Sequence, residues 1–132
     1  MADKTVAEKL RIKPGTSVWV SDESRRSLLG QMPPSVAEAD RPGTASTAVL
    51  FVDDAAGARS LFSTYREHLL VSPNVWVLYP KGNKTDINRD SLWPIVADYG
   101  MRPITQVSVD DTWSALRFRA LKDGEAPFTG GR

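Results

Sequence analysis

Apolar and polar residues follow two different periods along the chain, and together these periods predict an α/β fold. Several short apolar runs are continuous, which is typical of strands that a parallel sheet buries on both faces. Other segments place apolar residues every three or four positions, which is typical of helices that bury one face. We expect strands at residues 16–20, 48–52, 75–79, 104–109 and 113–121, and helices at 5–12, 21–30, 55–69 and 91–99.

Residues 31–47 follow neither period. They contain three prolines, one glycine and almost no large apolar side chain, which indicates a long surface connection. Whether this connection holds a weak edge strand around Val36 stays open.

Pro94 lies inside the last predicted helix. It costs little if Asp90 is the N-cap, because the amides of the first turn have no partner within the helix. If the helix begins before Asp90, we expect Pro94 to kink it.

The order of these elements predicts the direction of each strand. Strands joined by helices run parallel through right-handed crossovers, whereas the last strand follows a tight turn and therefore runs antiparallel. We expect one Rossmann-like domain over residues 1–121, a small doubly wound and mostly parallel sheet with helices on both faces and a C-terminal antiparallel hairpin. Residues 122–132, rich in glycine and charge, are expected to form a flexible tail.

Composition excludes several classes of function. The 132 residues contain no cysteine and one histidine, which excludes thiolate zinc sites, iron–sulfur clusters and multi-histidine metal sites. The formal net charge of +1 disfavours a nucleic-acid partner. The chain shows neither a signal-peptide pattern nor an apolar run long enough for a membrane span, so we expect a cytoplasmic protein without a membrane partner.

Polar segments follow the predicted strands, and a doubly wound sheet binds ligands at the carboxyl ends of its strands. These segments are residues 21–23, 53–54, 81–84 and 110–113. We expect all four to share one rim of the sheet, although they are far apart in the chain.

Residues 81–90 are a candidate anion site. Lys81, Lys84 and Arg89 supply positive charge before a predicted helix N-terminus, which favours phosphate or carboxylate. A solvated turn between strand and helix explains the same residues.

Acidic residues at the rim allow two interpretations. Asp22, Asp53, Asp110 and Asp111 could together hold a magnesium ion. Helix capping explains the first two and turn chemistry explains the others, so we expect no metal site.

Trp113 and Arg117 form a further candidate, because an aromatic face and a guanidinium suit stacking and anion contacts. A core tryptophan and a solvent-facing row formed by Arg117 and Arg119 explain the same alternation. The sequence-based ligand candidates are therefore Lys81, Lys84, Arg89, Asp110, Asp111, Trp113 and Arg117.

Residues 10–20, with their Lys-Pro-Gly turn, resemble the segment that leads into the first strand of class I methyltransferases. That family places a glycine-rich turn after the strand to cradle S-adenosylmethionine. Residues 21–26 contain no glycine, so their side chains would block the close backbone approach. We therefore expect no cofactor.

Five motifs resemble a small, chiefly actinobacterial family catalogued as a domain of unknown function. They are Lys9–Gly15, Leu28–Gly30, Val75–Gly82, Thr85-Asp86 with Arg89-Asp90, and especially Asp110–Arg119. The resemblance covers nearly the whole chain and implies a compact α/β fold without an assigned activity.

Three functions are compatible with these patterns. The leading hypothesis is a non-catalytic module that binds a protein partner or a small anionic ligand at the rim. The first alternative is an enzyme acting on a phosphorylated or carboxylated metabolite, with Lys81, Lys84 and Arg89 on the anion and Asp110 or Asp111 as acid–base group or magnesium ligand. The second alternative is a homodimer subunit that pairs through its hairpin.

Overall fold

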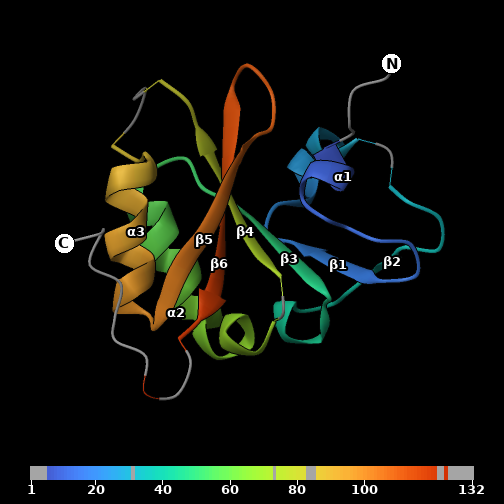
Figure 1. Cartoon of the computed structure of the whole chain (residues 1–132), viewed down its shortest axis with the longest axis horizontal. Helices are drawn as coiled ribbons and strands as arrows, with labels where there is room; N and C mark the ends of the chain where they lie inside the picture. Colours follow the sequence, from blue (N-terminus) through green and yellow to red (C-terminus); the bar gives the residue numbers. More distant parts are fainter. Residues whose placement is uncertain (1–5, 31, 73, 83–85, 122–123, 125–132) are drawn as a thin grey trace.

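The computed structural model describes residues 6–30, 32–72, 74–82, 86–121 and 124. Its centre is a six-stranded sheet in the order β2-β1-β3-β4-β6-β5 (Figure 1). The strands are β1 (Ser17–Val20), β2 (Ala37–Glu38), β3 (Thr47–Phe51), β4 (Val75–Pro80), β5 (Met101–Ser108) and β6 (Trp113–Ala120). The predicted α/β class and mostly parallel sheet are confirmed.

Strand directions agree with the prediction from element order. β2, β1, β3 and β4 pair in parallel, and β6 runs antiparallel between β4 and β5. Because β5 is antiparallel to β6, it points the same way as β4. The C-terminal hairpin is therefore present, and its second strand inserts between β4 and β5.

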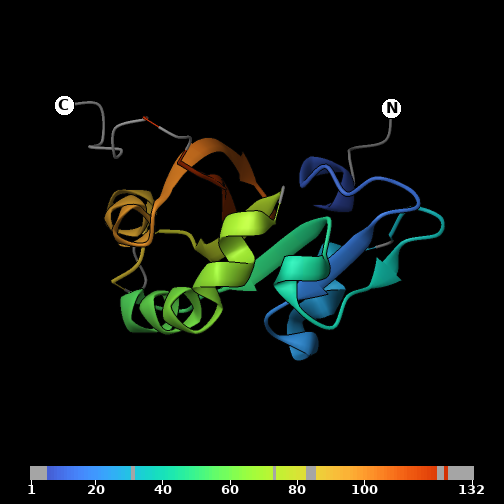
Figure 2. The ribbon, with the colours of Figure 1, turned by 90° about the horizontal axis from the view of Figure 1, so that it is seen from below.

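Helices cover both faces of the sheet. They are α1 (Val6–Lys9), α2 (Ala55–Val71) and α3 (Arg89–Asp98), with a 3-10 helix η1 (Glu23–Leu29) and a short turn η2 (Pro42–Thr44). Figure 2 shows α2 and α3 on the side opposite α1. None of these helices combines the length and apolar character that crossing a bilayer requires, within the part of the chain described.

Each face of the sheet has its own apolar core. The core beneath α2 and α3 includes Leu50, Phe62 and Phe118, all fully buried. The core beneath α1 and η1 includes Leu10, Leu29 and Trp76, also fully buried. Continuous apolar runs in β3 and β4 supply side chains to both cores, which explains why these strands lack alternation.

The structure answers the open question about residues 31–47. Ala37 and Glu38 form the short edge strand β2, which pairs with Ser17 and Val18. The edge strand therefore exists immediately after Val36, although only two residues pair.

α3 begins before Asp90, so the expectation that Asp90 is its N-cap is wrong. Its N-cap is Asn88, whose side chain accepts from the amide of Ser91 at 2.9 Å, and not Asp90. Pro94 therefore lies inside the helix, where its missing N–H removes one backbone hydrogen bond. The tail prediction for residues 122–132 concerns a segment that lies, except for Gly124, outside the described residues.

Candidate functional site

The carboxyl ends of the parallel strands β1, β3 and β4 follow one another along one edge of the sheet. The amide of Ser21 donates to the carbonyl of Val49, and the amide of Lys81 donates to the carbonyl of Thr112 at 2.8 Å. Pro80 pairs with Trp113 across the sheet. The structure therefore places Asp53, Lys81 and Asp110 at the same rim, as the element order predicted.

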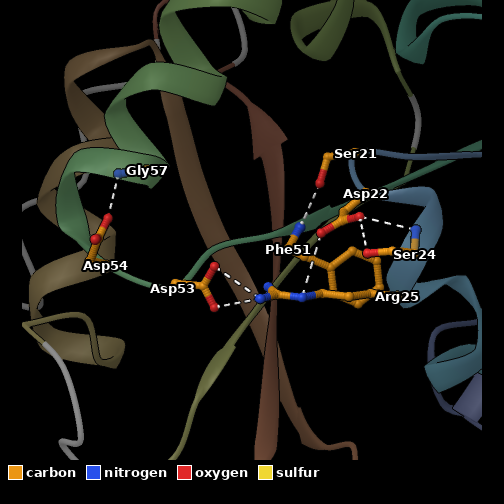
Figure 3. Close-up of polar contacts among 8 residues, drawn as sticks. All are labelled: Ser21, Asp22, Ser24, Arg25, Phe51, Asp53, Asp54 and Gly57. Atoms are coloured by element: carbon orange, nitrogen blue, oxygen red, sulfur yellow. Dashed lines mark hydrogen bonds and ion pairs between the residues drawn. The ribbon is translucent and has the colours of Figure 1, made fainter.

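Arg25 occupies the middle of this rim. Its Nη2 atom lies 2.8 and 3.0 Å from the two carboxylate oxygens of Asp53, which directly follows the end of β3. Its Nε atom lies 3.5 Å from Asp22, which follows β1. Figure 3 shows the guanidinium between these two carboxylates. One cation thus connects the ends of two neighbouring parallel strands.

Trp113 supplies an aromatic surface to the same cation. The guanidinium carbon of Arg25 lies 5.1 Å from the centroid of the Trp113 ring, within the range of a cation–π contact. Trp113 is only 9% exposed and packs edge-on against Phe51 at 6.1 Å between ring centroids. Its ring is therefore fixed by the core while it contacts Arg25. We call the group formed by Asp22, Arg25, Asp53 and Trp113 the rim cluster.

Asp22 is also the N-cap of η1. Its Oδ1 atom accepts from the amide of Ser24 at 3.0 Å and from the Ser24 hydroxyl at 2.6 Å. The Ser24 hydroxyl bond is the largest cause that lowers the pKa of Asp22, and the positive charge of Arg25 adds to it. Asp22 therefore carries a negative charge at neutral pH, directly beside the guanidinium.

A second arginine in the same turn reaches the neighbouring strand. Arg26 Nε lies 3.4 Å from Glu38, the last residue of β2. The carboxylates at the ends of β1, β2 and β3 are thus all paired with side chains from one turn. Arg26 Nη1 is buried without a hydrogen-bond partner among the described residues.

Asp54 has a different task from its neighbour. It accepts from the amide of Gly57 at 2.7 Å and so caps α2 (Figure 3). Capping therefore explains Asp54, whereas Asp53 belongs to the rim cluster. Sequence reasoning offered capping for both residues.

The hairpin between β5 and β6 fixes the other predicted residues at the rim. Asp110 accepts from the amides of Thr112 and Trp113 at 2.8 and 2.7 Å, so its carboxylate closes the turn as the turn interpretation expected. The Lys81 ammonium donates to the Ser108 hydroxyl. Asp111 is exposed.

One predicted ligand residue, Arg117, stands apart from the rim cluster. Arg117 lies in the middle of β6, opposite Trp76 and Thr105. Lys84 lies outside the described residues. Arg89 begins α3, and its side chain is not described.

Sequence reasoning missed Arg25 and Arg26 as site residues. It treated residues 21–26 as a turn that lacks glycine. The available signal was the placement of two consecutive arginines after a strand whose neighbours end in carboxylates.

Three carboxylates at or near the rim pair with arginines of the chain. No group of three His, Asp or Glu side chains suited to a metal ion occurs within residues 6–30, 32–72, 74–82 and 86–121. Asp22 and Asp53 instead share the Arg25 cation.

Comparison with known proteins supports the fold. No protein-family model and no curated protein sequence matches the chain. A solved structure of a proposed tRNA (m1A22) methyltransferase from Streptococcus pneumoniae has a TM-score of 0.58 at 10% identity, covering 98% of this chain and 74% of that chain. A protein of the NADB-Rossmann superfamily from Streptococcus agalactiae also has a TM-score of 0.58, at 8% identity over 98% and 72% of the two chains.

The pneumococcal protein in complex with S-adenosyl-L-methionine has a TM-score of 0.52 at 10% identity, covering 98% of this chain and 77% of that chain. The hypothesis of a non-catalytic module is contradicted by these neighbours, because solved chains with this fold are described as methyltransferases and one holds the cofactor. Sequence reasoning took the absent glycine turn as evidence against the whole class. What the chain shares with these proteins is the Rossmann-like methyltransferase fold.

Proposed function

We propose that the chain is a methyltransferase-type enzyme that binds S-adenosylmethionine at the rim cluster. The observation that carries the proposal is the cation between Asp22 and Asp53 and over Trp113, at the ends of two parallel strands. In such sheets the ligand site lies at this edge. The solved neighbours described as methyltransferases support the same class of activity.

The donor set of the rim cluster suits the cationic part of this cofactor. S-adenosylmethionine carries a sulfonium and an ammonium group, and carboxylates and aromatic faces both stabilise such cations. In the described structure the guanidinium of Arg25 occupies the position of such a cation, because it contacts the Asp53 carboxylate and the Trp113 ring. Asp22, Asp53 and Trp113 would then hold the cofactor in place of Arg25.

The turn after β1 contributes differently from a glycine-rich turn. Residues 21–26 contain no glycine, and the amide of Ser24 already donates to Asp22. We therefore propose that side chains, rather than turn amides, make the main contacts. This departs from the sequence-based expectation of no cofactor, because that expectation considered only the backbone of the turn.

Displacing Arg25 requires little free energy. The Arg25 and Asp53 side chains are 28% and 61% exposed, and exposed ion pairs contribute about 0–1 kcal/mol. The contact with Trp113 adds about 0.5–1 kcal/mol. A total of about 0.5–2 kcal/mol lowers the affinity of a competing cation by about two- to thirtyfold, which a cofactor with two cationic groups can offset.

The bound cofactor would supply an electrophilic methyl group at the rim. Asp22 and Asp53 would hold its positive charges, and the buried Trp113 would limit access of water to one side. Membership in the small actinobacterial family, a cytoplasmic location and a homodimer remain proposals beside this function.

Calorimetric titration with S-adenosylmethionine and S-adenosylhomocysteine tests the proposal. Arg25→Ala should bind S-adenosylmethionine about two- to thirtyfold more tightly than the wild type, because the competing cation is gone. Asp53→Asn should weaken the binding of S-adenosylmethionine more than the binding of S-adenosylhomocysteine, because only S-adenosylmethionine carries a sulfonium charge.

Arg59→Ala is the matched control, because Arg59 makes an exposed ion pair with Asp98 at 3.2 Å between α2 and α3. It should leave both affinities unchanged. Absence of binding to wild type and Arg25→Ala at millimolar cofactor would contradict the proposed function.

A further inference from the structure

A groove of about 510 Å³ opens beside the sheet, and none of its lining residues belongs to the rim cluster. Ser108, at the end of β5, is the lining residue next to the rim, because its hydroxyl accepts from Lys81. Glu8, Lys9 and Arg11 line it from α1 and the residues after it, and Trp76, Thr105 and Val107 line it from β4 and β5. α2 and α3 lie on the opposite side of the sheet (Figure 2). The groove therefore occupies the part of the α1 face that lies over β5 and β6.

Arg117 lies on β6, between the two strands whose residues Trp76 and Thr105 line the groove. It pairs with Trp76 on β4 and with Thr105 on β5, so all three side chains share one face of the sheet. Its Nε atom is buried and has no hydrogen-bond partner among the described residues. Burial and then the positive charge of Arg11 lower the pKa of Arg117.

The backbone of Arg11 adopts a conformation that is unfavourable for an arginine. Arg11 has a φ of 60°, a left-handed conformation that L residues other than glycine, asparagine and aspartate seldom adopt. The preceding carbonyl, of Leu10, accepts from Trp76 Nε1 at 2.8 Å and from Asn74 Nδ2 at 3.1 Å. Buried side chains of β4 and the residue before it thus hold the backbone at Leu10, the residue that precedes Arg11.

The groove holds more positive than negative charge. Among the described lining residues, Lys9 and Arg11 carry positive charge and Glu8 carries the one negative charge, and the Lys9 ammonium already donates to the Ser108 carbonyl at 3.1 Å. Arg117 adds a further positive charge from β6, on the same face of the sheet. Neither Arg11 nor Arg117 makes an ion pair or side-chain hydrogen bond with a described residue. Two guanidiniums that repel each other without a shared acid are stabilised by an anion between them.

We propose that this groove binds the phosphate group of a small molecule, with Arg11 and Arg117 donating to its oxygens. Guanidiniums match phosphate in geometry as well as charge. The volume exceeds that of a phosphate group and leaves room for the rest of a metabolite over Thr105 and Val107. This site is separate from the rim cluster and does not depend on the cofactor proposed there.

Inorganic pyrophosphate is the probe, with citrate at equal ionic strength as a carboxylate comparison. Binding is measured by calorimetry and located by the NMR signal of the Trp76 indole N–H. We expect pyrophosphate to bind at least tenfold more tightly than citrate and to shift the Trp76 signal. Equal affinity for both anions, or no shift at Trp76, would overturn the proposal.

Two variants test the arginines separately. Arg11→Gly removes the side chain and accepts the positive φ, whereas Arg117→Met keeps the apolar stem but not the charge. Each variant should weaken the binding of pyrophosphate at least tenfold. Arg66→Met is the control, because Arg66 is exposed on α2 across the sheet, and it should change the affinity less than twofold.

Thermal unfolding distinguishes a binding role from a structural one. Arg117→Met should keep or raise the melting temperature, because it removes a partly desolvated charge that faces a like charge. A lower melting temperature with unchanged pyrophosphate affinity would show that Arg117 serves the fold and overturn the proposal. If Arg117→Met fails to fold, unchanged affinity in Arg11→Gly is sufficient to overturn it.

Discussion

The indole Nε1 of Trp76 donates a 2.8 Å hydrogen bond to the carbonyl oxygen of Leu10, 66 residues earlier in the chain. Trp76 is fully buried in β4, in the centre of the sheet. Asn74 Nδ2 donates to the same carbonyl at 3.1 Å. The end of the first helical segment is therefore fastened to the sheet by two buried polar groups. This contact also sets the backbone from which Arg11 extends.

Trp76→Phe should lower the free energy of unfolding by about 2 kcal/mol, because it removes a buried hydrogen bond and part of a fully packed ring. Urea denaturation measures the loss. Trp19→Phe is the control, since Trp19 is also buried but contacts Tyr65 edge-on at 4.8 Å, and its indole makes no hydrogen bond with a described residue. Hydrogen exchange should accelerate at Leu10 and Ile12 only in Trp76→Phe, and equal effects of both variants would contradict the prediction.

The sheet and its rim could be predicted because local pattern determines them. The continuous apolar runs at 48–52 and 75–79 are too short for helices and too apolar for loops, so they had to be central strands. Once the crossovers make these strands parallel, the polar residues that follow must share an edge. The prediction therefore placed Asp53 and Lys81 at the same rim, where the structure also has them.

The identity of the rim cluster could not be predicted, because it depends on how far side chains reach across the sheet. Arg25 contacts Asp53 only because β1 and β3 pair in the register Val20 to Val49, and periodicity does not determine register. Sequence reasoning judged the turn by its missing glycine and gave its arginines no role. The lack of a hydrogen-bond partner at Arg117 Nε could not be predicted either, because it depends on which side chains pack around β6.

The start of α3 was uncertain because two neighbouring residues are both good N-caps. Asn88 takes this position through a reciprocal pair, in which its side chain accepts from the Ser91 amide and its own amide donates to the Ser91 hydroxyl. Asn88→Ala should therefore lower the free energy of unfolding by about 1 kcal/mol. Asn88→Asp should retain most of the stability, because aspartate caps equally well. Equal losses for both variants in urea denaturation would show that Asn88 is not the cap.

Ser24→Ala should raise the pKa of Asp22, because the Ser24 hydroxyl bond is the largest cause that lowers it. Carboxyl ¹³C chemical shifts across an acid titration measure this pKa. Arg25→Met should raise the pKa of Asp22 less, because the charge of Arg25 lowers this pKa by less than either hydrogen bond from Ser24 does. A larger shift in Arg25→Met than in Ser24→Ala would contradict the assignment.

The same pKa has a consequence for stability at low pH. Because the folded pKa of Asp22 lies below its unfolded value of about 3.9, its contribution is complete above that value. The contribution is lost as the pH falls through the lower, folded pKa. Ser24→Ala should therefore narrow the difference in stability between pH 5 and pH 2, and an unchanged difference would contradict this linkage.

Arg25 and Asp53 should contribute little to folding even though their contact is well formed. Both side chains are partly exposed, so a double-mutant cycle with Arg25→Met and Asp53→Asn should give a coupling below about 1 kcal/mol. The coupling should fall further at 1 M salt, because exposed charges are screened. A site that a cationic cofactor enters must have such a weak internal pair. A coupling of about 3 kcal/mol or more would make Arg25 a structural residue that a cofactor could not displace at ordinary concentrations, and the proposed function would lose its physical basis.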